Sequence, residues 1–157
     1  KLLASALKSI ARDKPDTASG ILAKLAQDGS SGYAVLARFN QAAILAKKGD
    51  GKAASGAYLA LSDDSSIDEI MRDMALIMAA LHGIESGDAV ALSQKLTRLI
   101  NGTNAWRHSA KELSALLAQK SGDKAKAQKL YKELSDDATA PSGIRTRAAE
   151  MTAILGG

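Results

Sequence analysis

The sequence predicts an all-α protein built from a repeated pair of helices. Its apolar residues are mostly Ala and Leu, only 3% of its residues are aromatic, and it has two prolines, a composition that favours helix. Apolar residues recur every three or four positions, which is the spacing of one helix face. Short turns rich in Gly and Asp separate these stretches. The 157 residues are enough for one domain with a sizeable core.

The first hairpin is expected over about residues 1–28. Its first helix covers about residues 1–12 and has one apolar face. Its second helix begins at Pro15, because proline suits the first turn of a helix. Turn residues at 28–32 end it.

The second hairpin is expected over about residues 31–62, with a turn at 48–51 between its helices. The third is expected over about 67–100. Ser66 and Glu69 have the spacing of a capping box at its start.

The fourth hairpin, over about residues 105–136, is the best-preserved copy. Gly122 supplies the left-handed residue that ends its first helix, and Asp123 can cap the free N–H groups of its second. The same punctuation is expected at Gly49-Asp50 and Gly87-Asp88. A closing helix is expected over residues 141–155. The expected structural positions are Gly49, Asp50, Gly87, Asp88, Trp106, Gly122, Asp123 and Tyr131.

Four anchor residues place these hairpins in one register. The anchors are Lys14, Asp50, Asp88 and Asp123, and their spacings of 36, 38 and 35 residues are close to the 34-residue tetratricopeptide unit. The shared apolar positions are Ala18, Ala54, Leu92 and Ala127 four residues after the anchor, Leu22, Tyr58, Leu96 and Tyr131 eight after, and Leu25, Leu61, Leu99 and Leu134 eleven after. Small residues in such positions let neighbouring helices approach, and the large ones fill the space between units.

Composition excludes several classes of partner and site. The net charge of +4 and a pI near 9.3 fit a solvated lysine face. The five aromatic residues have core-like spacing and no interleaved basic stretch, so no nucleic-acid partner is expected. Without cysteine the chain has neither disulfides nor thiolate metal sites. No apolar run reaches the roughly 18 residues of a membrane span, and the start at Lys1 is compatible with a domain whose targeting or anchoring segment was removed.

No residues combine into an active-site motif. His82 and His108 are the two histidines, and neither lies at ligand spacing from two carboxylates. The paired carboxylates at 63–64 and 136–137 follow helices, where Asp is common in turns. We therefore expect no catalytic residue, metal, cofactor or small-molecule substrate, and we do not expect an enzyme.

Four arginines, Arg38, Arg72, Arg107 and Arg147, are expected to bond carbonyls and carboxylates between neighbouring helices. The alternative is a carboxylate clamp for a peptide end.

In a superhelix of such units, the first helix of each unit lines a concave face that can bind an extended or helical segment. The candidate partner-binding residues on this face are Leu36, Phe39, Ile77, Leu81, Glu112 and Leu116. A terminal helix folded into the groove would instead make these positions part of the core, and the sequence leaves both arrangements open.

Several stretches together resemble a known family. They are GYAVLARFNQAAILAKKGD (32–50), MRDMALIMAAL (71–81), NAWRHSAKELSALLAQKSGD (104–123) and GIRTRAAEM (143–151). The chain is similar to the alphaproteobacterial tetratricopeptide-like proteins related to the ancillary subunit of the SecYEG translocon. Ala127, Tyr131 and Leu134 match second-helix positions of the tetratricopeptide repeat, and Gly122 matches its turn glycine.

The resemblance implies a right-handed superhelix of four hairpins with a C-terminal capping helix. It also implies a non-catalytic scaffold on the periplasmic face of a bacterial inner membrane, anchored by a segment before Lys1, that contacts the Sec translocon or periplasmic chaperones. The alternative is a soluble cytosolic adaptor or assembly scaffold with the same fold. A membrane helix just before Lys1 would distinguish the first from the second.

Overall fold

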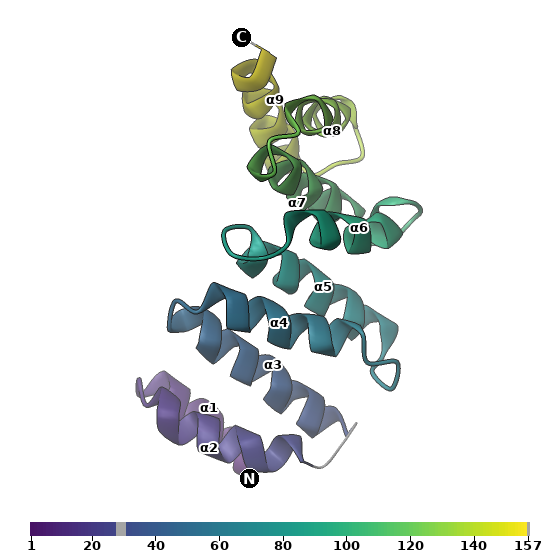
Figure 1. The fold of residues 1–157 in the computed structure, drawn as a ribbon. Helices are drawn as coiled ribbons and strands as arrows, with labels where there is room; N and C mark the ends of the chain where they lie inside the picture. Colours follow the sequence, from purple (N-terminus) through teal and green to yellow (C-terminus); the bar gives the residue numbers. More distant parts are fainter. Residues whose placement is uncertain (28–30, 157) are drawn as a thin grey trace. The chain divides into compact units, whose positions relative to one another are not determined.

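The computed structural model describes residues 1–27 and 31–156, and this part of the chain forms nine α-helices joined by turns (Figure 1). The helices are α1 (Leu2–Ala11), α2 (Pro15–Ala26), α3 (Gly32–Lys47), α4 (Gly51–Ser62), α5 (Glu69–Gly83), α6 (Ala89–Ile100), α7 (Arg107–Lys120), α8 (Lys124–Asp136) and α9 (Ser142–Gly156). The described ranges contain no strand, so the all-α prediction is confirmed. Residues 28–30 of the predicted turn after the first hairpin lie outside the described residues.

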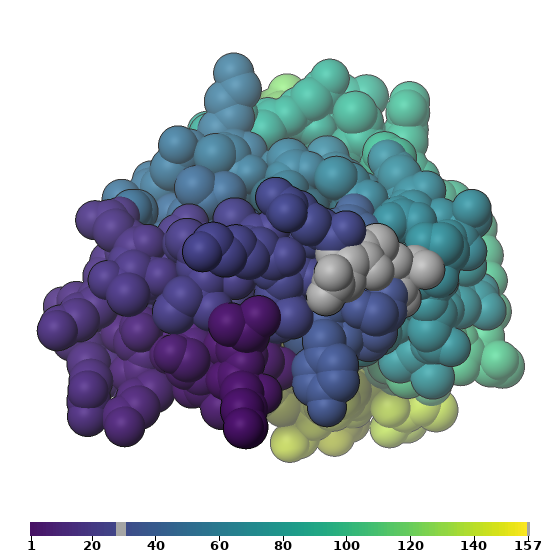
Figure 2. All heavy atoms as spheres, turned by 90° about the horizontal axis from the view of Figure 1, so that it is seen from below, coloured from purple at the N-terminus to yellow at the C-terminus, as the bar shows by residue number. Residues whose placement is uncertain are grey.

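The chain divides into two compact units, Lys1–His82 and Gly83–Gly157. In the first unit α1 packs on α2, α2 on α3, and α3 on α4. Figure 2 shows the purple atoms of the first helix pair directly against the blue atoms of α3. In the second unit α7 packs on α6, α8 and α9, and α8 also packs on α9.

The first unit has two clusters of buried apolar side chains. One joins α1, α2 and α3 through Ala6, Ala18, Leu22, Leu25, Ala37 and Ile44. The other joins α3, α4 and α5 through Val35, Phe39, Ala42, Tyr58, Leu61, Ile67, Ala75 and Ala79. The buried hydroxyl of Ser55 donates to the carbonyl of Ala79, a member of this second cluster, at 2.8 Å, which ties α4 to α5.

The second unit has a cluster between α7, α8 and α9, formed by Ala115, Ala118, Ala127, Tyr131, Leu134, Ile144 and Ala148. Four of its seven members are alanines, so the helices approach closely and the three large side chains fill the space between them.

The register of the predicted repeat is borne out by burial. All twelve positions found four, eight and eleven residues after the anchors are buried, and the most exposed of them, Leu25, has only 8% of its surface exposed. The small residues Ala42, Ala80 and Ala115, one in each later unit, are fully buried. The same positions therefore form the core of each helix pair.

Three hairpin turns share one backbone geometry. The residue before the anchor is left-handed in each: Asp13 has a φ of 55°, Gly49 of 82° and Gly122 of 85°. The anchor N–H then donates to a carbonyl five residues earlier, as in a Schellman closure. These bonds are Lys14 to Ser9 at 2.9 Å, Asp50 to Leu45 at 3.1 Å and Asp123 to Ala118 at 2.8 Å.

The anchor aspartates also start the second helices. Asp50 Oδ1 accepts from the Ala53 N–H at 2.9 Å, and Asp123 Oδ1 accepts from the Lys126 N–H at 3.0 Å. Asp88 Oδ1 accepts from two N–H groups at the start of α6. Lys14 offers no side-chain cap, because lysine has no acceptor.

Gly87 does not repeat the turn of Gly49 and Gly122. Its φ lies outside the left-handed region, and its N–H donates to the Gly83 carbonyl at 2.7 Å. A Cβ at this position would lie 2.7 Å from the Gly83 oxygen and 2.9 Å from Leu92 Cδ1. Glycine is therefore required at Gly87 by close approach, and the predicted left-handed punctuation is wrong there.

The predicted capping box at the start of α5 is also wrong. Asp68 Oδ1 accepts from the Ile70 N–H at 2.9 Å and so caps the helix. Ser66 instead donates both its hydroxyl and its N–H to Asp64 Oδ1, at 2.6 and 3.1 Å. Asp68 caps α5 in place of Ser66 because it immediately precedes the helix and because a carboxylate accepts hydrogen bonds strongly.

The aromatic residues do not all belong to the core. Phe39, Tyr58 and Tyr131 are buried, as their spacing predicts. Tyr33 is 66% exposed and lies in the first turn of α3. Trp106 is half-buried and occupies the N-cap position of α7.

Replacing Tyr131 with Phe is expected to stabilise the second unit. The Tyr131 hydroxyl is buried and has no hydrogen-bond partner among the described residues, and burial, followed by the charge of Glu112, raises its pKa to about 12. Two of the other three copies carry Leu at this position. Removing an unsatisfied buried hydroxyl should raise the free energy of unfolding by about 1 kcal/mol, measured by urea denaturation. A loss of stability in Tyr131→Phe would show that the hydroxyl is satisfied.

Candidate functional site

The candidate site is a surface channel in the first unit, which we name the α3–α5 groove. It runs between α3 and α5, with Tyr58 of α4 at its base. Two hollows follow one another along it. Residues 32–36 face 66–71 in the first, and residues 39–43 face 74–78 in the second. Residue numbers increase in the same direction along both sides of the groove, so α3 and α5 run parallel to one another.

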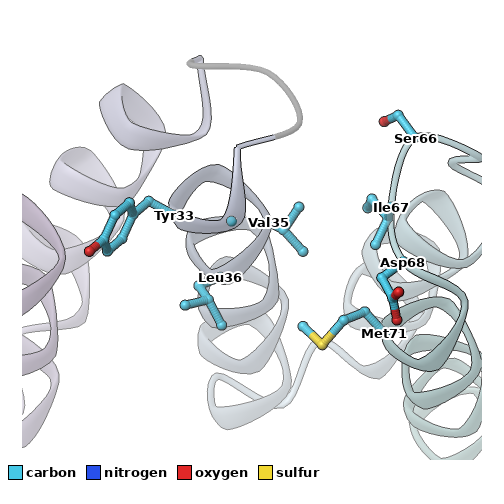
Figure 3. Close-up of a pocket in the computed structure, with 8 residues that line it drawn as sticks. Tyr33, Val35, Leu36, Ser66, Ile67, Asp68 and Met71 are labelled. Carbon is cyan, nitrogen blue, oxygen red and sulfur yellow. The ribbon is translucent and has the colours of Figure 1, made fainter.

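The larger hollow has a volume of about 560 Å³ and lies where both helices begin. It is lined by Gly32, Tyr33, Val35 and Leu36 on one side and by Ser66, Ile67, Asp68 and Met71 on the other. Figure 3 shows Val35 and Met71 extending into the space between the two helices. The ring of Tyr33 instead points toward the first helix pair (Figure 3), where it lines a separate hollow of about 310 Å³ with Leu2, Leu3 and Leu25.

The smaller hollow has a volume of about 230 Å³ and is lined by Phe39, Asn40, Ala43, Tyr58, Met74 and Met78. Its base is rigid, because the rings of Phe39 and Tyr58 pack at a centroid distance of 5.9 Å and Tyr58 stacks on His82 at 5.7 Å. His82 therefore packs against the aromatic pair at the base of this hollow.

Methionine forms one wall of the groove. Three of the four methionines of the chain, Met71, Met74 and Met78, line the two hollows from α5. Met is flexible and polarisable, so such a wall adapts to differently shaped apolar side chains. These three methionines are not among the residues that the sequence predicts for the site. The repeat register contained the signal, since Met74 lies fourteen residues before its anchor, as Leu36 does.

The predicted partner-binding residues of the first unit have different environments. Leu36 and Leu81 are 41% and 48% exposed, and Leu36 lines the larger hollow. Phe39 and Ile77 are buried, with 9% and 8% of their surfaces exposed, and Phe39 lines the smaller hollow. Leu36 and Phe39 are therefore brought together in the groove.

The two predicted residues of the second unit, Glu112 and Leu116, are both partly buried. Glu112 forms a two-pronged ion pair with Arg147 of α9, at 2.7 and 2.9 Å. Leu116 packs against the apolar cluster of α7, α8 and α9. Both contacts link α7 to its neighbours within the unit.

The groove is acidic where the two helices begin. Asp68 lines the larger hollow, and the segment 63–69 around it carries four carboxylates and no basic residue. Asp64 is paired with Arg38 at 2.7 Å, whereas Asp68 is exposed and Glu69 has no ion pair in the described ranges. Among residues 1–27 and 31–156, no Lys or Arg lines either hollow.

A second polar cluster joins the start of α7 to the loop between α8 and α9. His108 is 8% exposed, and its Nε2 lies 3.1 Å from Asp137 Oδ2 and 3.3 Å from Thr139 Oγ1. The Thr139 hydroxyl and N–H both donate to Asp137 Oδ1, at 2.6 and 2.8 Å. This arrangement closes the loop over α7, and the carboxylate acts in it as a turn and capping group.

Acid should weaken this loop closure. Hydrogen bonds from Thr139, with a smaller contribution from His108, lower the pKa of Asp137 from 3.8 to about 2. A lowered pKa stabilises the fold above about pH 4, and that stabilisation is lost as the pH falls toward 2. We therefore expect the melting temperature of Asp137→Asn to lie below that of wild type at pH 6 and to converge with it near pH 2, measured by circular dichroism. A constant difference across this range would contradict the assignment.

Two of the four arginines pair with carboxylates of neighbouring segments, as predicted, whereas Arg107 bonds a carbonyl of its own segment and a hydroxyl. Arg38 pairs with Asp64, Arg147 pairs with Glu112, and Arg107 donates to the Asn104 carbonyl at 3.5 Å and to Thr139 Oγ1 at 3.3 Å. Arg72 is half-buried, and its Nε has no hydrogen-bond partner in the described part of the chain.

Comparison of the chain with protein-family models, with curated proteins and with solved structures finds no match. Across residues 1–27 and 31–156, no three His, Cys, Asp or Glu side chains are grouped so that they could hold a metal ion. Within the same ranges, none of the helices has the length and apolar character needed to cross a bilayer. The α3–α5 groove, an apolar channel with an acidic end, is the feature from which a function can be argued.

Proposed function

We propose that this protein is a non-catalytic scaffold that binds other proteins through a tetratricopeptide-like superhelix of four helix hairpins and a closing helix. The observation that carries the proposal is the α3–α5 groove, an apolar channel between the first helices of two successive repeats. In repeat scaffolds these helices form the binding surface. An exposed apolar channel of this kind is costly unless a partner covers it.

The register of the repeat supports the proposal. Twelve positions spread over four hairpins are buried in the same phase, and three turns close through the same hydrogen bond. Such a chain uses its large side chains mainly for packing between neighbouring helices. We therefore place the function on the surface that the repeats leave exposed.

The specific version of the proposal rests on the resemblance. In it the chain is the periplasmic domain of an inner-membrane protein, and its partner belongs to the Sec translocon or to the periplasmic chaperones. A soluble cytosolic adaptor remains the alternative. The reading frame upstream of Lys1 discriminates between them, because only the first requires a membrane helix there.

Photocrosslinking in the native host tests the proposal. A photoreactive amino acid placed at Leu36, in the full-length protein, should yield a defined protein adduct. The same group at Ile154, a 69% exposed residue of α9, is the control for random collision. A translocon or chaperone component in the Leu36 adduct supports the specific version, and a cytosolic partner supports the alternative. The absence of any Leu36-dependent adduct would overturn the scaffold proposal.

A further inference from the structure

The chemistry of the α3–α5 groove defines the kind of partner that fits it. From Tyr33 to Ala43 the wall formed by α3 extends roughly 15 Å at 1.5 Å per residue, which matches about three turns of a helix. Both walls present side chains at helical spacing: Leu36, Asn40 and Ala43 on α3, and Met71, Met74 and Met78 on α5. A helix with an apolar stripe of similar length complements this surface.

The base and the walls of the groove differ in stiffness. Phe39 and Tyr58 are buried and packed against one another, so they form a fixed floor. The methionine side chains are only partly buried and can change rotamer at little cost. The groove therefore selects for the apolar character and length of the guest stripe more than for one particular side chain.

Charge sets the orientation of the guest. Asp68 lies at the rim of the larger hollow, next to Glu69, while the residues that line the smaller hollow carry no charge. A positively charged group at one end of the guest would meet these carboxylates, and a negatively charged one would be repelled. The same carboxylates disfavour an anionic lipid surface as the occupant.

We infer that the α3–α5 groove receives an amphipathic helix of a partner protein, about three turns long, whose large apolar side chains enter between α3 and α5 and whose basic end lies against Asp68 and Glu69. This inference rests on the proposed scaffold function and names the chemistry of its partner.

Two synthetic peptides test the inference on the full chain. Both carry leucines at positions i, i+4, i+7 and i+11 in an Ala and Gln background, and one ends in two lysines where the other ends in two glutamates. Fluorescence anisotropy should show the lysine peptide binding about tenfold more tightly at low salt, and the difference should shrink as salt screens the charges. Equal affinity for both peptides would overturn the charge assignment.

Two pairs of variants locate the site. Leu36→Asp should abolish binding of the lysine peptide, whereas Ile154→Asp, the same change at an exposed apolar residue outside the groove, should leave it unchanged. Asp68→Asn keeps the cap of α5, because Asn also accepts hydrogen bonds, and it should reduce the discrimination between the peptides. Asp136→Asn, which removes an exposed carboxylate paired with Lys132, is its control.

Four further outcomes would contradict the inference. Peptide binding that survives Leu36→Asp would place the site elsewhere. Binding of phosphatidylglycerol vesicles that depends on Leu36 would make a membrane the occupant. A Leu36 crosslink in cells combined with no binding of either peptide would leave the scaffold function standing and refute a helical guest. The loss of both the crosslink and peptide binding would refute the scaffold function as well.

Discussion

Replacing Leu134 with Ala is expected to destabilise the second unit strongly. Leu134 is fully buried between α7, α8 and α9, and most of its neighbours in the cluster are alanines. Because alanines cannot move into the space that a lost leucine leaves, the cavity should persist. Leu→Ala substitutions that leave such cavities cost about 3–5 kcal/mol, a large part of the stability of a small domain.

Urea denaturation followed by the fluorescence of Trp106 measures this effect. Trp106 is the only tryptophan and lies in the same unit, at the start of α7. Leu130→Ala is the matched control on the same helix, since Leu130 is only partly buried at the edge of the cluster and should cost less. If the two variants lost the same stability, the register that places Leu134 at the centre of the core would be wrong.

The helices were predictable because local signals agreed with one another. Apolar spacing, the prolines and the Gly and Asp turns all point to the same boundaries, and Pro15, Gly49 and Gly122 lie where the helices begin or end. The repeat register added information about packing, because a position shared by four hairpins has the same neighbours in each. Burial of Leu22, Tyr58, Leu96 and Tyr131 could therefore be predicted without a structure.

The failures occurred where contacts between residues close in sequence decided the outcome. Gly87 has the sequence of a left-handed turn, but the approach of Gly83 and Leu92 decides its conformation. Ser66 has capping-box spacing, yet Asp64 engages it and Asp68 caps the helix. Neither outcome is encoded in the spacing of the residues alone.

The groove was only partly predictable for a related reason. Leu36 and Phe39 are predicted from their place on the first helix of a unit, and both line the groove. Met71 and Met74 are not predicted for the groove. Helical periodicity shows that a helix face is apolar, but it does not show where a neighbouring helix stops covering that face. On α5 the face of Ile77 is buried, while the adjacent methionine face borders the hollows.

Replacing Gly87 with Ala should also be strongly destabilising, because the added methyl group would overlap a neighbouring backbone atom. The new Cβ would lie 2.7 Å from the Gly83 carbonyl oxygen, a backbone atom that cannot rotate away. The turn would have to open, and the hydrogen bond from the Gly87 N–H to the same oxygen would weaken. Overpacking of this kind typically costs about 1–3 kcal/mol, detectable as a lower urea midpoint by Trp106 fluorescence.

Gly143→Ala in α9 is the matched control within the same unit. Its Cβ would meet only the end of the Arg147 side chain, at an ordinary 3.6 Å, so alanine should be neutral or should stabilise the helix by up to about 1 kcal/mol. Both substitutions add one methyl group, but Gly87→Ala is expected to lower the free energy of unfolding and Gly143→Ala is expected to leave it unchanged or raise it. An unchanged urea midpoint in Gly87→Ala would mean that the turn before α6 opens without cost, and the close approach would then not be the reason for glycine at this position.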